Sequence, residues 1–299
     1  MERVAPSPRL QVGIISAGRV GVALAEVFAA SGHRVSGIVA PSERSRRRAE
    51  HRVPEVPCVD VPTAARAQLV VLAVPDPHLS GVAQQVAEYT HDGQMVMHTS
   101  GRFGCAALQP VTDTGALPLA LHPAMMFTDT PRDSANLDGC AWGVTADSKI
   151  GQVAAEVLIH SLHGRPVTIP EDRRAAYHAV LAHAANHTTA LLADAATMMD
   201  AVLASDGVDG PAGNSWAFQP QTAVLLQQIT QEAARTGVAS RLAELTGPII
   251  RDDANAVRGH LAALEELGVS TDFYRSAAIP TARQVGAADV LRVLLDPDR

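Results

Sequence analysis

The sequence predicts an α/β domain with a mostly parallel sheet at residues 10–169, followed by an all-helical second domain at residues 170–299. Up to about Ile169, short apolar runs alternate with helix-length stretches, which is the pattern of βαβ units. After Pro170 the chain reads as helices, with no convincing strand. A length of 299 residues is sufficient for two domains of this kind.

Seven apolar runs predict the strands of the first domain. They are Leu10–Ile15, Arg34–Val39, Leu69–Val74, Gln94–His98, Ala116–Leu121, Cys140–Thr145 and Arg165–Ile169. Crossover helices are expected at Val20–Ala30 and Leu79–Tyr89, whereas the three prolines of Val53–Thr63 allow only a very short strand. The later strands have less helix between them, so we expect the far half of the sheet to be less regular.

A long helix from Glu171 to about Leu203 is expected to open the second domain. Further helices are predicted at Pro220–Thr236, Ala239–Leu245, Asp252–Leu267 and Pro280–Leu294. The alanine-rich faces of this domain favour a homodimer.

Composition and charge exclude several classes of function. The 24 basic and 31 acidic residues give a net charge of −7, which would repel a nucleic-acid backbone. No apolar run approaches the ~20 residues that cross a bilayer, so we expect no membrane association and a soluble, cytoplasmic protein. Three cysteines far apart indicate free thiols, and His183 and His187 lack the intervening Glu of a zinc helix, so no metal is expected.

The clearest motif joins the first predicted strand to the first predicted helix. Ser16-Ala17-Gly18-Arg19-Val20-Gly21 is a dinucleotide fingerprint in which Ser replaces the first Gly. In this pattern the second Gly lets the backbone approach a pyrophosphate and the third lets the helix pack on the strand. The start of the helix then faces the pyrophosphate, where its dipole favours an anion. These six residues predict a Rossmann-like domain that binds a dinucleotide.

The end of the second predicted strand distinguishes NADP from NAD. NAD sites place an Asp or Glu at this strand tip to bind the ribose hydroxyls, and no carboxylate stands there in this sequence. Ser42 can donate to a 2′-phosphate, and Arg44 or Arg46 can pair with it. NADP is therefore the predicted cofactor.

Several further motifs resemble a bacterial family of Rossmann-like proteins with a C-terminal helical domain of formerly unknown function. The residues that carry the resemblance are Ser16–Gly21, Ala73-Val74-Pro75-Asp76, His98-Thr99-Ser100-Gly101, Leu121-His122-Pro123, Tyr177-His178 with Asn186, and Leu245-Thr246-Gly247-Pro248 leading to Arg251, Asp253 and His260. This family is similar to pyrroline-5-carboxylate reductase, ketopantoate reductase and 6-phosphogluconate dehydrogenase-like enzymes. The resemblance implies an NADP-dependent reductase in which Val74 and Pro75 contact the cofactor, with ketopantoate reduction in pantothenate synthesis as the activity.

The sequence departs from these relatives in two places. The ketopantoate and hydroxyacid enzymes use a lysine on the first long helix of the second domain, and the only lysine of this chain is Lys149. The Arg-Gly-Asp of the family reads Arg251-Asp252-Asp253, which leaves the backbone role of the glycine open.

Histidines are the candidates for the proton donor that reduction of a carbonyl requires. His98 and His122 end predicted strands, and the carboxyl ends of parallel strands face the cofactor crevice. His178 and Asn186 share one predicted face of the long helix, and His178 is the first choice. Ser100, Gly101 and Arg251 are the candidate ligands of a substrate carboxylate.

The sequence therefore predicts an NADPH-dependent reductase of a small 2-oxo acid similar to ketopantoate, with the nicotinamide between the two domains. One alternative is an imine reductase of the pyrroline-5-carboxylate type, and another is a regulatory protein that binds NADP without turnover. A deazaflavin in place of an organic substrate would use the same loop.

Overall fold

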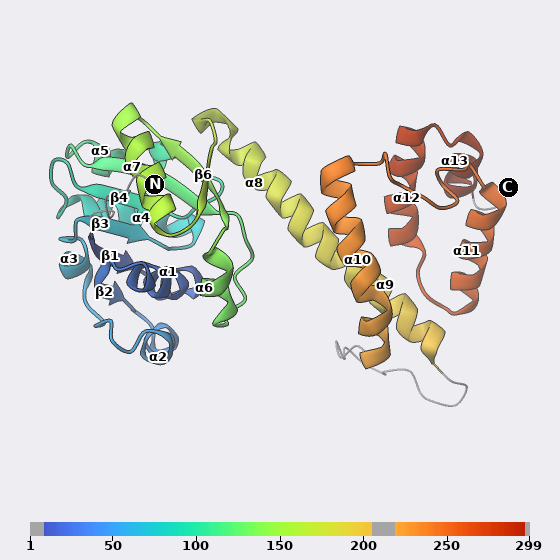
Figure 1. The fold of residues 1–299 in the computed structure, drawn as a ribbon, viewed down its shortest axis with the longest axis horizontal. Coiled ribbons are helices and arrows are strands. Elements are labelled where there is room, and N and C mark those ends of the chain that lie inside the picture. Colours follow the sequence, from blue (N-terminus) through green and yellow to red (C-terminus); the bar gives the residue numbers. More distant parts are fainter. Residues whose placement is uncertain (1–8, 205–218, 297–299) are drawn as a thin grey trace, which may run out of the picture. The chain divides into compact units, whose positions relative to one another are not determined.

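The first part of the chain is an α/β domain built on one sheet of seven strands, in a computed structural model that describes residues 9–204 and 219–296 (Figure 1). The strand order is β2-β1-β3-β4-β5-β6-β7. Only β5 and β6 pair antiparallel; all other neighbours are parallel. The predicted mostly parallel sheet is confirmed, and its antiparallel pair lies in the half expected to be less regular.

Each strand overlaps one of the predicted apolar runs. The strands are β1 (Gln11–Ile15), β2 (Arg34–Val39), β3 (Leu69–Leu72), β4 (Met95–His98), β5 (Leu117–Pro123), β6 (Ala141–Ala146) and β7 (Arg165–Thr168). Between β2 and β3 the chain makes a single bridge from Cys58 to Ile38, as the prolines there require. Ile15 of β1 lies opposite Leu72 of β3, so the loops after these strands leave the same edge of the sheet.

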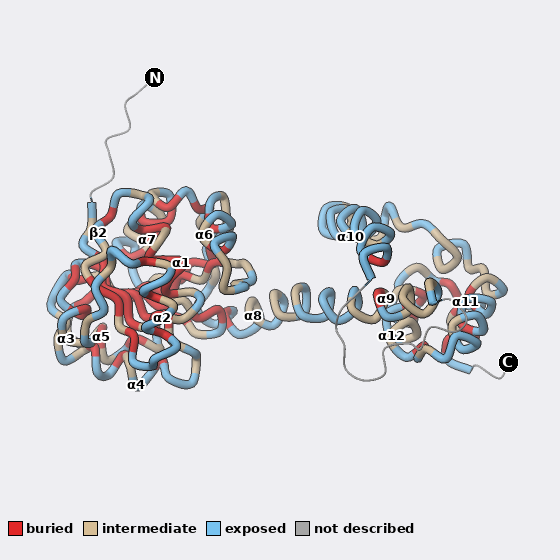
Figure 2. The backbone as a smooth tube through the Cα atoms, turned by 90° about the horizontal axis from the view of Figure 1, so that it is seen from below, coloured by how far each residue is buried: buried red, intermediate tan, exposed pale blue. Residues whose placement is uncertain are grey.

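Helices cover both faces of this sheet, and each face has its own apolar core. They are α1 (Arg19–Ala30), α2 (Glu43–Arg52), α3 (Val61–Ala64), α4 (Asp76–Ala87), α5 (Gln109–Thr112), α6 (Arg132–Leu137) and α7 (Lys149–Ser161). The last helix of this unit, α8 (Arg174–Ala182), follows β7 and contributes no residue to either core. One core joins α1, α2, α6 and α7 to the sheet, and the other joins α3, α4 and α5 to the opposite face. The central strands β1, β3, β4 and β5 are buried, which explains why they read as continuous apolar runs (Figure 2), whereas β7 at the sheet edge is mostly exposed.

The chain divides into two compact units, one ending at His183 and the other beginning at Ala184. Within its described residues the second unit is helical, as predicted, with α9 (Thr188–Leu203), α10 (Pro220–Ser240), α11 (Ala254–Glu266), α12 (Asp272–Val285) and α13 (Ala288–Leu295). A small core of α11, α12 and α13 contains Val257, Ala282 and Val290.

The helix predicted from Glu171 to about Leu203 is present, with a 3-10 turn at Glu171–Arg173 and a π-helical turn (His183–His187) between α8 and α9. Two other predictions about the helices were wrong. No separate helix forms at Ala239–Leu245, since α10 extends to Ser240 and ends at Arg241, whose φ is 54°. Pro280 lies inside α12 rather than at a helix start, and left-handed Gly286 ends that helix before α13.

None of the described helices has both the length and the apolar character needed to cross a membrane.

Candidate cofactor and active site

The loop between β1 and α1 has the backbone of a dinucleotide-binding turn. Ser16 has a φ of 96°, the left-handed region that the first Gly of the fingerprint normally occupies. A Cβ atom at Gly21 would lie 1.9 Å from the carbonyl oxygen of Ser16, so only glycine lets α1 pack this closely. A Cβ at Gly18 would meet nothing nearer than the Ser16 hydroxyl at 3.4 Å, so the protein itself does not require glycine there. That space is where the fingerprint places a pyrophosphate.

The start of α1 can receive this anion. Gly18 precedes the helix in extended conformation, no side chain caps the first turn, and no acidic residue lies in it. The first backbone N–H groups of a helix have no partner within the helix, and the dipole adds positive charge there. Ala17 is buried beneath the loop, whereas Arg19 is exposed beside it. These residues fit a dinucleotide.

The tip of β2 carries the residues predicted to recognise the 2′-phosphate. Ser42 begins α2 with a capping box, in which its hydroxyl accepts a hydrogen bond from the Ser45 amide at 3.1 Å. Arg44 is exposed, and Arg46 folds back toward the Pro41 carbonyl oxygen at 3.3 Å. The acidic residue of this turn, Glu43, is paired with an arginine one turn along the helix.

We expect NADPH to bind at least about tenfold more tightly than NADH. A hydrogen bond from a charged group contributes about 1.5 kcal/mol or more, and ~1.4 kcal/mol is tenfold in affinity. Calorimetric titration of both cofactors checks this, with NADH as the internal control for an Arg44→Ala, Arg46→Ala variant. The variant should lose affinity for NADPH only. Equal affinity of the natural protein for both cofactors would refute the role of this turn.

The loop after β3 leaves the same sheet edge. The Ala73 amide donates to the Ile15 carbonyl oxygen at 3.0 Å, which fixes this loop beside the dinucleotide loop. Val74 is half-buried and Pro75 is exposed at the start of α4. Both stand where a bound dinucleotide would cross the sheet edge.

His98, at the end of β4, is fully buried and organises the loop that follows it. Its Nδ1 accepts a hydrogen bond from the Ser100 amide at 3.1 Å, so its Nε2 donates to the Gly104 carbonyl oxygen at 2.9 Å. Burial lowers the pKa of His98 to about 4. Both ring nitrogens are therefore engaged inside the loop. The Ser100 hydroxyl accepts from the Arg102 and Phe103 amides, both at 3.2 Å.

The stability of the protein should fall as the pH is lowered from about 6.5 to about 4. Over this range the unfolded state protonates His98 and the folded state does not, at a cost of at most about 3 kcal/mol. Urea unfolding should show that the stability difference between the natural protein and His98→Gln narrows across this interval. A difference that is independent of pH would contradict the assignment.

Three of the predicted site residues converge in the first unit. A Cβ at Gly101 would lie 2.7 Å from His178 Cδ2 and 3.0 Å from His122 Nε2, so this glycine lies against both imidazoles. The ring centres of His122 and His178 are 6.4 Å apart and perpendicular. His122 Nδ1 is 3.0 Å from the hydroxyl of Tyr177, which comes from α8. Burial, followed by the charge of Arg174, lowers the pKa of His122 to about 4.

A buried cation lies beside this cluster. Arg174, 1% exposed, donates to the carbonyl oxygens of Phe103 at 2.9 Å, Gly143 at 3.1 Å and Ser100. Its guanidinium carbon lies 5.6 Å from the ring centre of Tyr177. In the described part of the chain no carboxylate comes within ion-pair distance of it. Burial lowers the pKa of Arg174, but a guanidinium stays protonated in proteins, so Arg174 places a positive charge beside the two histidines.

Two candidate residues belong to the second unit. Asn186 is exposed and lies in the π-helical turn (His183–His187). Arg251 is exposed in the turn before α11. The structure therefore joins neither residue to the histidine cluster, and their roles stay predictions.

Asp252 stands where the resembled family has the glycine of Arg-Gly-Asp. Its φ is 53°, a left-handed backbone that Asp tolerates better than most residues. Its carboxylate accepts hydrogen bonds from the amides of Val290 at 2.9 Å and Asp289 at 3.2 Å. Asp252 thereby caps the start of α13.

The sequence analysis gave no site role to Arg174 or to Tyr177, although Tyr177 belongs to the motif with His178. Arg174 lies four positions before His178 and so shares a helical face with it. Among the described residues, no three His, Cys, Asp or Glu side chains are close enough together to hold a metal ion.

Two family models together cover most of the chain. Residues 3–123 match the model of a Rossmann-like domain, and residues 140–281 match that of the domain of unknown function DUF2520. The chain is a Rossmann-like domain followed by a DUF2520 domain. This confirms the resemblance drawn from the motifs. No curated protein matches the sequence.

Solved structures share the fold of this Rossmann–DUF2520 chain at low sequence identity. A Bacteroides fragilis protein described as an NADP oxidoreductase has a TM-score of 0.69 at 18% identity, over 93% of this chain and 98% of that one. A reductive aminase from Aspergillus terreus, in complex with NADPH and ethyl levulinate, has a TM-score of 0.63 at 15% identity, over 98% and 100%. A pyrroline-5-carboxylate reductase from Coxiella burnetii has a TM-score of 0.58 at 14% identity, over 93% and 99%. The fold is thus one found among NADP-dependent oxidoreductases.

Proposed function

We propose that this protein is an NADPH-dependent reductase of a small 2-oxo acid similar to ketopantoate. The observation that carries the proposal is the buried charge of Arg174 beside His122 and His178, which carbonyl oxygens rather than a carboxylate surround. These residues lie in the same unit as a loop that fits a dinucleotide. A positive site favours both a carboxylate substrate and the alkoxide that develops when its carbonyl is reduced.

Different residues of the first unit bind the cofactor and donate the proton. Gly18 and the first turn of α1 bind the pyrophosphate, and Ser42 with Arg44 or Arg46 binds the 2′-phosphate. When bound, NADPH supplies the hydride that adds to the carbonyl carbon. His178 donates a proton to the carbonyl oxygen as the alkoxide develops, and it is half-buried, so it can be reprotonated from solvent.

His122 serves this step by staying uncharged. Its low pKa keeps the ring neutral near pH 7, and its hydrogen bond with Tyr177 fixes its orientation against Gly101. Arg174 holds the Ser100 and Phe103 carbonyl groups, which keeps the loop after β4 in place.

A second candidate is an imine reductase. It is supported by the shared fold with a pyrroline-5-carboxylate reductase and with a reductive aminase. The charge of Arg174 argues against it for a cationic iminium substrate, because like charges repel at a buried site. The repulsion is smaller for an imine that carries a carboxylate, because the carboxylate offsets the charge of the iminium.

The test is to mix the purified protein with NADPH and follow the loss of reduced nicotinamide absorbance on addition of ketopantoate, other 2-oxo acids, or pyrroline-5-carboxylate. Turnover of a 2-oxo acid supports the first proposal, and turnover of the cyclic imine alone supports the second. NADPH binding without turnover on any of them would instead support a regulatory role.

We also propose that the protein is a homodimer, for which the second unit offers an apolar surface. Leu225 and Ile229 of α10 are 53% and 65% exposed and lie one turn apart on the same face of the helix, and exposed apolar side chains that lie together mark interaction sites. Light scattering should give twice the mass of one chain, and Leu225→Glu with Ile229→Glu should shift the mass toward one chain. A single-chain mass at every concentration tested would contradict this.

A further inference from the structure

The dinucleotide loop contains a residue whose backbone needs outside support. Ser16 holds a φ of 96° with a side chain present, a conformation that persists only where the surroundings over-determine it. Part of that support is local, because the Ser16 hydroxyl accepts the Gly18 amide at 3.3 Å.

The remaining support acts on the next residue. The Ala17 amide donates to the Val39 carbonyl oxygen at 2.9 Å, and the Ala17 carbonyl oxygen accepts from Arg48 Nη1 at 3.2 Å. Both polar backbone groups of Ala17 are thereby tied to parts of the chain outside the loop. Arg48 comes from α2, so it reaches the loop from the helix that follows the β2 tip.

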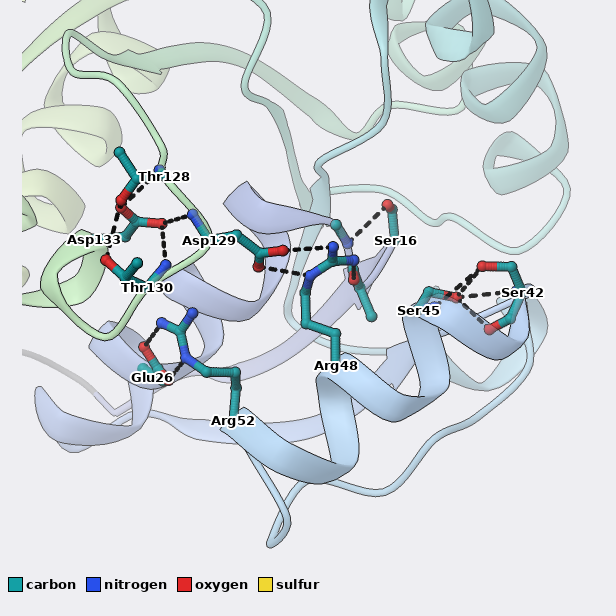
Figure 3. Close-up of polar contacts among 12 residues, drawn as sticks. Ser16, Glu26, Ser42, Ser45, Arg48, Arg52, Thr128, Asp129, Thr130 and Asp133 are labelled. Carbon is teal, nitrogen blue, oxygen red and sulfur yellow. Dashed lines mark hydrogen bonds and ion pairs between the residues drawn. The ribbon is translucent and has the colours of Figure 1, made fainter. Parts of the chain in front are cut away.

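Arg48 is itself held rigidly, as Figure 3 shows. Its Nε and Nη2 each donate to a carboxylate oxygen of Asp129 at 2.7 Å. The segment that contains Asp129 is held by Asp133, which is fully buried. The Asp133 carboxylate accepts hydrogen bonds from the backbone amides of Thr128 at 2.9 Å and Asp129 at 2.8 Å. The chain of contacts thus leads from a buried carboxylate to the phosphate-binding loop.

We propose that Arg48, oriented by Asp129, is a positioning residue that holds the serine-containing loop in the conformation that binds NADPH. The proposal rests on the proposed function for the cofactor alone, not for the substrate. A glycine at position 16 would adopt the same φ without strain, so the Arg48 contact is needed because Ser16 stands there.

The same helix provides a matched control. Arg52, one turn after Arg48, also forms a bidentate ion pair. Its Nε and Nη2 each donate to a carboxylate oxygen of Glu26 at 2.7 Å. Its side chain is 6% exposed against 13% for Arg48, so the two pairs are similarly buried. Arg52 makes no hydrogen bond to the dinucleotide loop. Loss of Arg52 should therefore affect the fold without affecting the loop.

The experiment is a double-mutant cycle of Arg48→Met and Ser16→Gly, with Arg52→Met as the control. Two quantities are measured for each variant: the dissociation constant of NADPH, and the midpoint of urea unfolding without cofactor. Arg48→Met should weaken NADPH binding about tenfold, the effect of losing one charge-assisted hydrogen bond. Arg52→Met should leave NADPH affinity within about twofold although it lowers the urea midpoint. Adding Ser16→Gly to Arg48→Met should restore most of the lost affinity.

The proposal is overturned if Arg48→Met leaves NADPH affinity unchanged, or weakens it equally with Ser and with Gly at position 16. If the natural protein binds no NADPH, the proposed function fails separately and the urea midpoints decide the question of the loop. If the two substitutions change the urea midpoint non-additively, Arg48 stabilises the loop that contains Ser16. If their effects on the midpoint add, the proposal is overturned.

Discussion

Gly18→Val should raise the dissociation constant for NADPH by at least about 100-fold, which corresponds to ~2.7 kcal/mol. The reason is steric, because a branched side chain would occupy the space that the fingerprint reserves for the pyrophosphate. The protein itself should tolerate the change. The new Cβ would lie 3.4 Å from the Ser16 hydroxyl and 4.0 Å from the Ala73 carbonyl oxygen, both ordinary contacts. Calorimetric titration of NADPH and a thermal unfolding curve measure the two effects separately.

Gly81→Val is the matched control for this variant. Gly81 lies in α4, and a Cβ there meets no atom within 4 Å. The same substitution at this position should leave NADPH binding unchanged. If Gly18→Val also kept its affinity for NADPH, the loop would be only a structural turn.

His178→Ala should lower kcat by about 10²- to 10⁴-fold, the usual contribution of a general acid. NADPH affinity should stay within a few-fold, because the side chain acts on the substrate carbonyl rather than on the dinucleotide. Steady-state kinetics with whichever substrate supports turnover gives kcat, and a titration gives the affinity. His160→Ala, which removes an exposed histidine of α7 in the same unit, is the control and should leave both values unchanged.

His122→Ala tests the competing assignment on the strand end. Its ring contacts Gly101 and Tyr177, so we expect it to matter for the shape of the site. If His122→Ala lowered kcat by about 10²- to 10⁴-fold and His178→Ala kept full turnover, the proton donor would lie on β5. The role of α8 would then be packing alone.

The central strands of the sheet were predictable because they are buried on both faces. An apolar run such as Leu69–Val74 around β3 lies between two layers of helices, so its composition alone distinguishes it from its surroundings. Helix limits were less predictable. Pro280 is typical of a helix start, yet in α12 it occupies the interior, where packing of neighbours such as Ala278 and Ala282 decides the structure.

The dinucleotide loop was the predictable part of the site, because its glycine spacing is specific to one kind of turn. Ser16–Gly21 follows β1 and opens α1, and the structure shows the turn that this context requires. Arg174 could not be assigned in this way, because its partners are carbonyl groups of Ser100, Phe103 and Gly143, which come together only in the folded sheet. Likewise the contact of Arg48 with the Ala17 carbonyl depends on how α2 lies against the loop.

Transfer of deuterium from NADPH tests the central claim most directly. The protein would be incubated with a 2-oxo acid and NADPH that carries deuterium at C4 of the nicotinamide, on one face and then on the other, and the product examined by mass spectrometry and NMR. We predict that one of the two labelled cofactors places a single deuterium on the former carbonyl carbon. NADPH that binds but transfers deuterium to no 2-oxo acid or imine would contradict the assignment of this protein as a reductase.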